Sequence, residues 1–230
     1  MALNNMKTAT ITFHAPNNNG SFLQAYALQK YITTHFDNVE NEIIDFQPES
    51  QQQQYAIFRK IHSKKDILRN LISFWHYKAL SKRFLAFSEM REKYLKMTKR
   101  CTTTEEAIKI AGNYDLVIAG SDQIWNTTAR DFSEAFFLPG ISKKSTYAVS
   151  CGSHLNEVDC DRICSAMETF ENVSVREIDT REFLEKHTKR SIETVLDPAF
   201  LLTKEDYSGL YDKERILKEK YIFLYTINYD

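Results

Sequence analysis

The chain has 230 residues, of which 43% are hydrophobic and 27% are charged, and its formal net charge is -1. This length and hydrophobic content suffice for a large buried core and exclude a disordered or fibrous chain. No apolar run reaches the roughly 18 residues that cross a bilayer, and the N-terminus lacks the layout of a signal peptide. We therefore expect a soluble, cytoplasmic protein with reduced cysteines.

Short apolar runs alternate with segments of helical period along the chain. This alternation predicts an α/β fold, a parallel sheet covered by helices. The expected strands are 8–13, 42–46, 116–119, 145–149, 173–175 and 193–196, with a further strand beginning at 221–225. The expected helices are 21–34, 156–170, 179–187 and 213–220.

A basic helical insert, at about 55–100, interrupts the alternation. Residues 59–100 contain 13 Lys and Arg against three acidic residues. Apolar positions between 57 and 95 predict two or three helices, and the glutamines at 51–54 predict a flexible connection before them. The basic helices could contact an anionic membrane, bind an anionic polymer or form a solvated surface, and we favour the solvated surface. Nucleic-acid binding is not expected, because the remaining chain is acidic and contains no known motif.

Five polar clusters each follow an expected strand. The carboxyl ends of parallel strands share one edge of a sheet, so we expect these clusters to face a common cleft. Each could also be an ordinary turn, and no dinucleotide or P-loop glycine pattern is present. The clusters are NNNG at 17–20, GSDQ at 120–123, SCGS at 150–153, RE at 176–177 and DP at 197–198.

The GSDQ cluster offers the clearest ligand chemistry. Gly120 would let a ligand approach the backbone, while Asp122 and Gln123 would place an acceptor and an amide at the start of a helix. A carboxylate there suits sugar hydroxyls, which it can bind or deprotonate. The alternative is that Asp122 only caps the helix. Trp125 could stack on a sugar ring or belong to the core.

Arg176 follows the strand at 173–175 and offers a bidentate fork for a carboxylate or phosphate. The competing interpretation is an ion pair with Glu177 or Asp179. His14 lies at the same edge and is a modest ligand candidate. Cys151 has no oriented base and third partner, so we do not expect cysteine catalysis.

These clusters resemble, in order and spacing, the polysaccharide pyruvyl transferase family, from about residue 10 to the end. The resemblance implies two Rossmann-like domains facing one another in a GT-B-like arrangement. It implies transfer of the pyruvyl group of phosphoenolpyruvate onto a sugar or lipid-linked saccharide as a ketal, with neither metal nor organic cofactor. The matching segments are NNNGSFLQAYALQKYI, YDLVIAGSDQIWN, STYAVSCGS, SVREIDTREFL and VLDPAFLL.

The resemblance also implies roles for particular residues. Arg176 would hold phosphoenolpyruvate, whereas Cys151 departs from the family motif. Together with the carboxylate chemistry of Asp122 described above, this makes Asp122 and Arg176 the expected catalytic residues. The residues expected to line the donor or acceptor site are Asn19, Gly20, Gly120, Ser121, Gln123, Trp125, Arg176 and His14.

Family members generally continue into a second domain, whose Arg-His motif is thought to supply the general acid. We therefore expect 1–220 to be an N-terminal Rossmann-like domain and 221–230 to begin a truncated second one, so that this chain alone lacks full activity. The alternatives are a non-catalytic domain that binds a sugar or a partner, and a GT-B-type glycosyltransferase that uses a nucleotide sugar. An open reading frame downstream would favour the enzyme over the binding domain.

Overall fold

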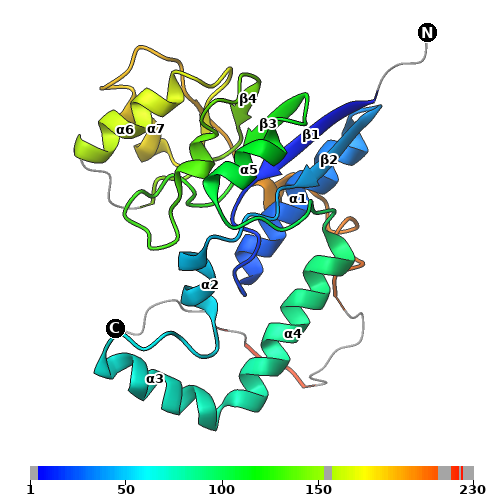
Figure 1. Ribbon diagram of the computed structural model, residues 1–230. Coiled ribbons are helices and arrows are strands. Elements are labelled where there is room, and N and C mark those ends of the chain that lie inside the picture. Colours follow the sequence, from blue (N-terminus) through cyan, green and yellow to red (C-terminus); the bar gives the residue numbers. More distant parts are fainter. Residues whose placement is uncertain (1–4, 153–156, 212–218, 223, 225–230) are drawn as a thin grey trace.

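The computed structural model describes residues 5–152, 157–211, 219–222 and 224. Its centre is a parallel sheet in the strand order β2-β1-β3-β4 (Figure 1). Helices cover both faces, so residues 8–11 of the central strand β1 are continuously buried rather than alternately exposed. The strands are β1 (Met6–Ile11), β2 (Val39–Ile43), β3 (Leu116–Ala119) and β4 (Lys144–Thr146).

Backbone pairing extends the sheet beyond both of its edges. Past β4, a parallel bridge joins Val149 to Val175 in β5 (Ser174–Val175), which pairs with β6 (Glu193–Thr194). Past β2, residues Met97 and Cys101 form parallel bridges with Ile43 and Phe46. The chain thus runs outward from β1 to β2 and the 97–101 edge, then returns to β3 on the other side of β1.

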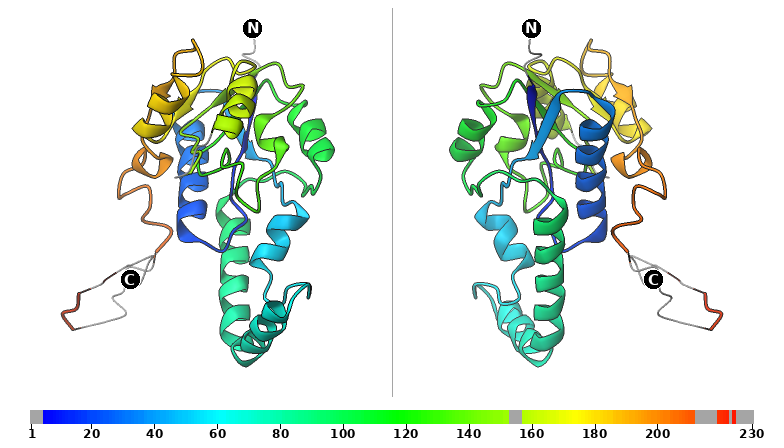
Figure 2. Two further views of the ribbon diagram at one scale, coloured as in Figure 1. Left: turned by 90° about the vertical axis from the view of Figure 1, so that its left-hand side faces the viewer. Right: turned by 90° about the vertical axis from the view of Figure 1, so that its right-hand side faces the viewer.

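Helices α1 (Asn19–His35) and α5 (Thr104–Ala111) lie on opposite faces of the sheet (Figure 2). Helix α1 begins where the Asn18 side chain accepts a hydrogen bond from the Gly20 amide. Helix α5 begins with a reciprocal capping box between Thr103 and Glu106. We did not predict this helix, although the sequence contains the capping-box pattern. The other connections are η1 (Glu134–Phe137), α6 (Glu157–Met167), α7 (Ile178–Leu184) and η2 (Pro198–Phe200).

Three helices between β2 and the 97–101 edge project away from the sheet (Figures 1 and 2). We call residues 49–94 the helical arm; it consists of α2 (Glu49–Tyr55), α3 (Lys64–Trp75) and α4 (Tyr77–Tyr94). The prediction of a flexible connection at 51–54 was wrong, because these glutamines form most of α2 and Gln51 is buried. Among the described residues, no helix has the length and apolar character to cross a bilayer.

The prediction of an α/β fold with a parallel sheet is confirmed, and every predicted strand before residue 200 coincides at least partly with an observed one. Strand β2 begins at Val39, three residues before its predicted start. The sequence analysis missed these residues because Glu40 and Asn41 are polar and interrupt the apolar run. The predicted helix at 213–220 falls almost wholly outside the described residues. The predicted strand at 221–225 falls partly outside the described residues. Its described residues, 221, 222 and 224, are not in a strand.

Candidate functional site

The polar clusters come together at the carboxyl edge of the sheet. They lie at the reversal point, next to β1, where the strand order changes direction because β2 and β3 lie on opposite sides of β1. Just beyond the ends of β1 and β3, the Ser21 hydroxyl donates to Oδ2 of Asp122 at 2.9 Å. The Ser150 amide donates to the carbonyl of Asp122, and the Arg176 amide donates to the carbonyl of Val149. In open parallel sheets this reversal point is where ligands usually bind.

Asp122 lies in a left-handed turn, with φ of 71°. Its Oδ1 accepts a hydrogen bond from the Gln123 amide at 2.8 Å. The expectation that Asp122 stands at the start of a following helix was wrong, because turns and bends follow it to residue 131. Its carboxylate is instead directed at the first turn of α1, where it remains partly exposed. The group can accept a hydrogen bond from a ligand hydroxyl or take its proton.

The two residues before Asp122 pack closely against the segment that follows β4. Gly120 has φ of 130°, and a side chain there would overlap the carbonyl oxygen of Tyr147 in the neighbouring segment. The Ser121 hydroxyl is fully buried and donates to the carbonyl of Ala148 at 2.9 Å. The burial of Ser121 corrects its prediction as a substrate contact, whereas the approach of a ligand to the Gly120 backbone stays a prediction.

Trp125 and His14 are also buried, which corrects their prediction as ligand contacts. The Trp125 indole has no exposed surface and packs against the rings of Phe137 and Phe170, so it cannot stack on a sugar. His14 has no exposed surface either, and its Nε2 lies 2.9 Å from Oδ1 of Asp45. Both side chains belong to the folded core of the domain.

Arg176 is held by two carboxylates at the sheet edge. Its Nε donates to Glu177 and its Nη1 to Asp197, each at 2.9 Å. Burial by itself would lower the pKa of Arg176, but these two partners and the charge of Asp122 raise it above its usual value. The predicted competing ion pair with Glu177 is therefore present, with Asp197 rather than Asp179 as the second partner. Among the described residues, Nη2 has no hydrogen-bond partner.

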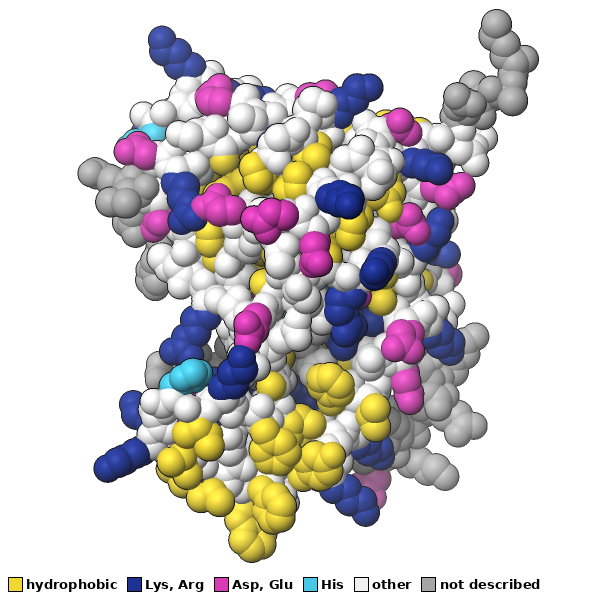
Figure 3. All heavy atoms as spheres, viewed as in Figure 1, with side chains coloured by type: hydrophobic (Ala, Val, Ile, Leu, Met, Phe, Trp, Pro, Cys, Tyr) yellow, Lys and Arg dark blue, Asp and Glu magenta, His cyan; other side chains and the backbone are white. Residues whose placement is uncertain are grey.

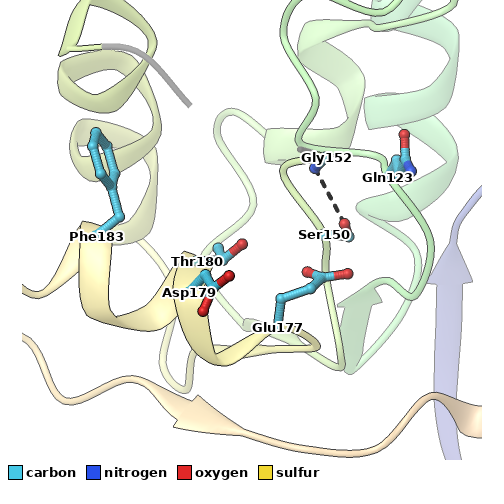
Figure 4. A pocket seen from close by; sticks show the side chains of 7 residues that line it. All are labelled: Gln123, Ser150, Gly152, Glu177, Asp179, Thr180 and Phe183. Atoms are coloured by element: carbon cyan, nitrogen blue, oxygen red, sulfur yellow. Dashed lines mark hydrogen bonds between the residues drawn. The ribbon is translucent and has the colours of Figure 1, made fainter. Parts of the chain in front are cut away.

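A cavity of about 500 Å³ opens at Glu177, one of the two carboxylates that hold Arg176 (Figure 4). Its charged side chains, Glu177 and Asp179, are both acidic, and Gln123 and Ser150 add polar groups. Carboxylates and amides suit the hydroxyls of a saccharide, and the two carboxylates repel a phosphate. The lining residues are Gln123, Ser150, Gly152, Glu177, Asp179, Thr180 and Phe183.

Helix α4 holds the NNNG loop from the other side of this edge. Arg91 donates through Nη1 to the carbonyl of Ala15 and to Oδ1 of Asn17, while Arg83 donates to the carbonyl of Asn17. Asn18 caps α1, and Asn19 and Gly20 form its first turn. The sequence predicted this loop but not its two arginine partners. Both arginines lie far from the loop along the chain, and only the folded structure brings them to it.

A second cavity, of about 550 Å³, lies between this loop and the helical arm. In contrast to the first, its charged side chains are the cationic Arg91 and Arg100. Guanidinium groups favour carboxylates and phosphates, so the two cavities differ in the ligands they suit. The aromatic residues that line the second cavity are Tyr55, Phe58, Tyr77 and Phe84.

A family model described as Polysaccharide pyruvyl transferase matches residues 18–230, which include the reversal point, Arg176 and both carboxylates that hold it. This chain belongs to the polysaccharide pyruvyl transferase family. No match to it was found among the curated proteins or among the solved structures. Membership makes the chain a transferase whose acceptor is a saccharide.

In this member of the polysaccharide pyruvyl transferase family, a second carboxyl group, that of Asp131, lies near Asp122. We did not predict it. The Asp131 side chain is buried, with 6% of its surface exposed. Burial raises its pKa, and the charge of Asp122 raises it further. Burial and the charges of these two carboxyls likewise raise the pKa of Tyr55 in α2 to about 12. A carboxyl that keeps its proton to a higher pH is suited to donating one.

Cys151 and metal binding were two further possibilities for chemistry in this family member. Burial raises the pKa of the Cys151 thiol, so the nucleophilic thiolate is scarce. Its neighbour His154 lies outside the described residues. In the part of the chain that the structure describes, no group of three His, Cys, Asp or Glu side chains is placed to hold a metal ion.

Proposed function

We propose that this protein binds phosphoenolpyruvate and transfers its pyruvyl group, as a ketal, to a saccharide of a cell-surface polysaccharide or its precursor in the cytoplasm. The family match over residues 18–230 carries this proposal. The reaction needs a proton for the methylene carbon of phosphoenolpyruvate, a departing phosphate and two sugar hydroxyls that add to one carbon, each losing its proton. It therefore calls for cations around the donor and carboxylates around the acceptor.

The charges at the sheet edge support a division of roles. Arg176 contacts the donor through its remaining Nη2, while Glu177 and Asp197 fix the orientation of the guanidinium. The acceptor saccharide occupies the carboxylate-lined cavity beside it. Asp122 takes a proton from an acceptor hydroxyl, and its bond from Ser21 fixes its position at the start of α1.

Titration calorimetry with phosphoenolpyruvate tests the role of Arg176. In Arg176→Gln, loss of a charge-assisted contact should weaken binding at least about tenfold. Arg176→Lys keeps the charge but not the fork, so it should retain part of the affinity. The matched control is Arg181→Gln. Arg181 lies on α7 and pairs with Glu185 just after that helix, so its loss removes an arginine in an ion pair that we do not place at the donor. Circular dichroism establishes that each variant is folded.

Equal affinity of Arg176→Gln and the unchanged protein would contradict this role. Absence of phosphoenolpyruvate binding by the unchanged protein would contradict the donor assignment itself. A non-catalytic sugar-binding role is the second candidate, because the first cavity has polar and acidic side chains suited to hydroxyls. Binding of a UDP- or GDP-sugar in place of phosphoenolpyruvate would instead favour a GT-B-type glycosyltransferase.

A further inference from the structure

Helix α3 of the helical arm is amphipathic, but its polar side faces the protein. On that side, Asn70 exchanges two hydrogen bonds with the backbone of Arg59, and Arg69 donates to the carbonyl of Ala56. Ser73, one turn further along, is buried. A helix that packs its polar side against its own chain leaves its apolar side without a partner.

The apolar side of α3 is correspondingly exposed. Trp75 is 83% exposed and Phe74 is 68% exposed. Hydrophobic side chains gather at the far end of the molecule in Figure 3, over α3 and its junction with α4. Isolated exposed apolar residues are common, whereas a contiguous group marks a contact surface. We call this group the apolar tip: Ile67, Leu68, Leu71, Ile72, Phe74 and Trp75.

Positive charge surrounds the apolar tip. The segment 58–85 contains eight Lys and Arg and a single acidic residue, Asp66. That carboxylate is bonded to Ser63 and to the amide of His62 at the start of α3. Lysines 64, 65, 78 and 82 are exposed. Apolar side chains with Trp among them, flanked by lysines, are typical of helices that lie in the interface of an anionic membrane.

We propose that the apolar tip docks on an anionic membrane surface, with α3 lying in the headgroup region. The 12 residues of α3 are too few to span a bilayer. The helical arm carries the tip well away from the sheet, so a flat surface can reach it (Figure 2). We expected a solvated surface for these helices, and the outward apolar side of α3 is the observation that changes this view. The docking goes beyond the proposed reaction and needs no phosphoenolpyruvate.

Vesicle flotation combined with tryptophan fluorescence tests the docking. The chain has two tryptophans, and Trp125 is fully buried, so a vesicle-induced emission change reports on Trp75. Vesicles of phosphatidylcholine with phosphatidylglycerol should float the protein and shift its emission to shorter wavelength. Trp75→Phe should lose the shift. Phosphatidylcholine alone should bind far more weakly, because the lysines then have no counterpart.

Two sets of variants separate the apolar and electrostatic contributions. Phe74→Glu should abolish flotation, whereas Phe36→Glu should not, since Phe36 is similarly exposed but lies at the end of α1. Replacing Lys64 and Lys65 by Gln should weaken binding roughly 25-fold. Lack of flotation by the unchanged protein, or equal flotation of Phe74→Glu, overturns the proposal. A dimer in sedimentation that Phe74→Glu dissociates, without vesicle binding, also overturns it and assigns the tip to a second copy.

Discussion

Replacing Asp45 by Asn removes the most strongly stabilised carboxylate near the sheet edge. Asp45 is 5% exposed and accepts hydrogen bonds from His14, Gln47 and Arg100. Burial by itself would raise the Asp45 pKa. The hydrogen bond and charge of His14, followed by the contacts of Gln47 and Arg100, outweigh burial and lower the pKa to about 2.

The size of the effect follows from the difference between the folded and unfolded pKa values of Asp45. The folded value of about 2 lies below the ordinary value of 3.8. Because each pKa unit corresponds to about 1.4 kcal/mol, the carboxylate contributes roughly 2 kcal/mol to the free energy of unfolding at pH 7. A lowered folded pKa means that this contribution is present above about pH 4 and is lost as the pH falls towards about 2. At pH 3 roughly half of it should remain.

Urea unfolding of the unchanged protein and Asp45→Asn at pH 7, 5 and 3 measures this contribution. The difference in unfolding free energy should be roughly 2 kcal/mol at pH 7 and 5 and about half of that at pH 3. Glu40→Gln is the control, since Glu40 is an exposed carboxylate whose pairing with Lys96 is screened by solvent, so its replacement should change the free energy of unfolding much less than Asp45→Asn. A difference that is the same at all three pH values would refute the reasoning.

Three further predictions concern buried groups. Gly120→Ala should destabilise the fold by about 2 kcal/mol or more in urea unfolding, because its Cβ would overlap Tyr147, whereas Gly209→Ala, which has open space, should change stability by less than about 1 kcal/mol. Cys151 should resist alkylation in the native protein and react on unfolding, while the partly exposed Cys164 should react first, as mass spectrometry of labelled peptides would establish. Burial lowers the pKa of Lys144 to about 8, so the folded protein binds fewer protons than the unfolded chain above that pH. Stability should therefore rise between pH 8 and 10 by an amount that Lys144→Met removes, and a flat profile for both would contradict this.

The sequence predicted the sheet because strands that are buried in a parallel sheet are short, mainly apolar runs that can be recognised locally. It also predicted that the NNNG loop, Asp122 and Arg176 would share one edge, since each follows a strand. The edge segment at 97–101 was not predicted, because its few paired residues carry no strand pattern and depend on contacts with β2.

Which polar or aromatic side chains at that edge remain exposed was decided by packing. Trp125 and His14 have the chemistry of ligand contacts, yet both have no exposed surface because core rings and a buried carboxylate surround them. Arg91 and Asp131 had no distinguishing local pattern, and they reach the edge only because α4 and the turn before η1 fold back towards it.

By itself, the sequence determined the α/β class, the order of the polar clusters and membership of the family, since periodicity and motif spacing are local properties. The tertiary structure decided which side of α3 faces solvent. The apolar period of that helix predicts only that one side differs from the other. Hydrogen bonds from Arg69 and Asn70 to the backbone at 56 and 59 turn the polar side inward, and they leave Phe74 and Trp75 exposed.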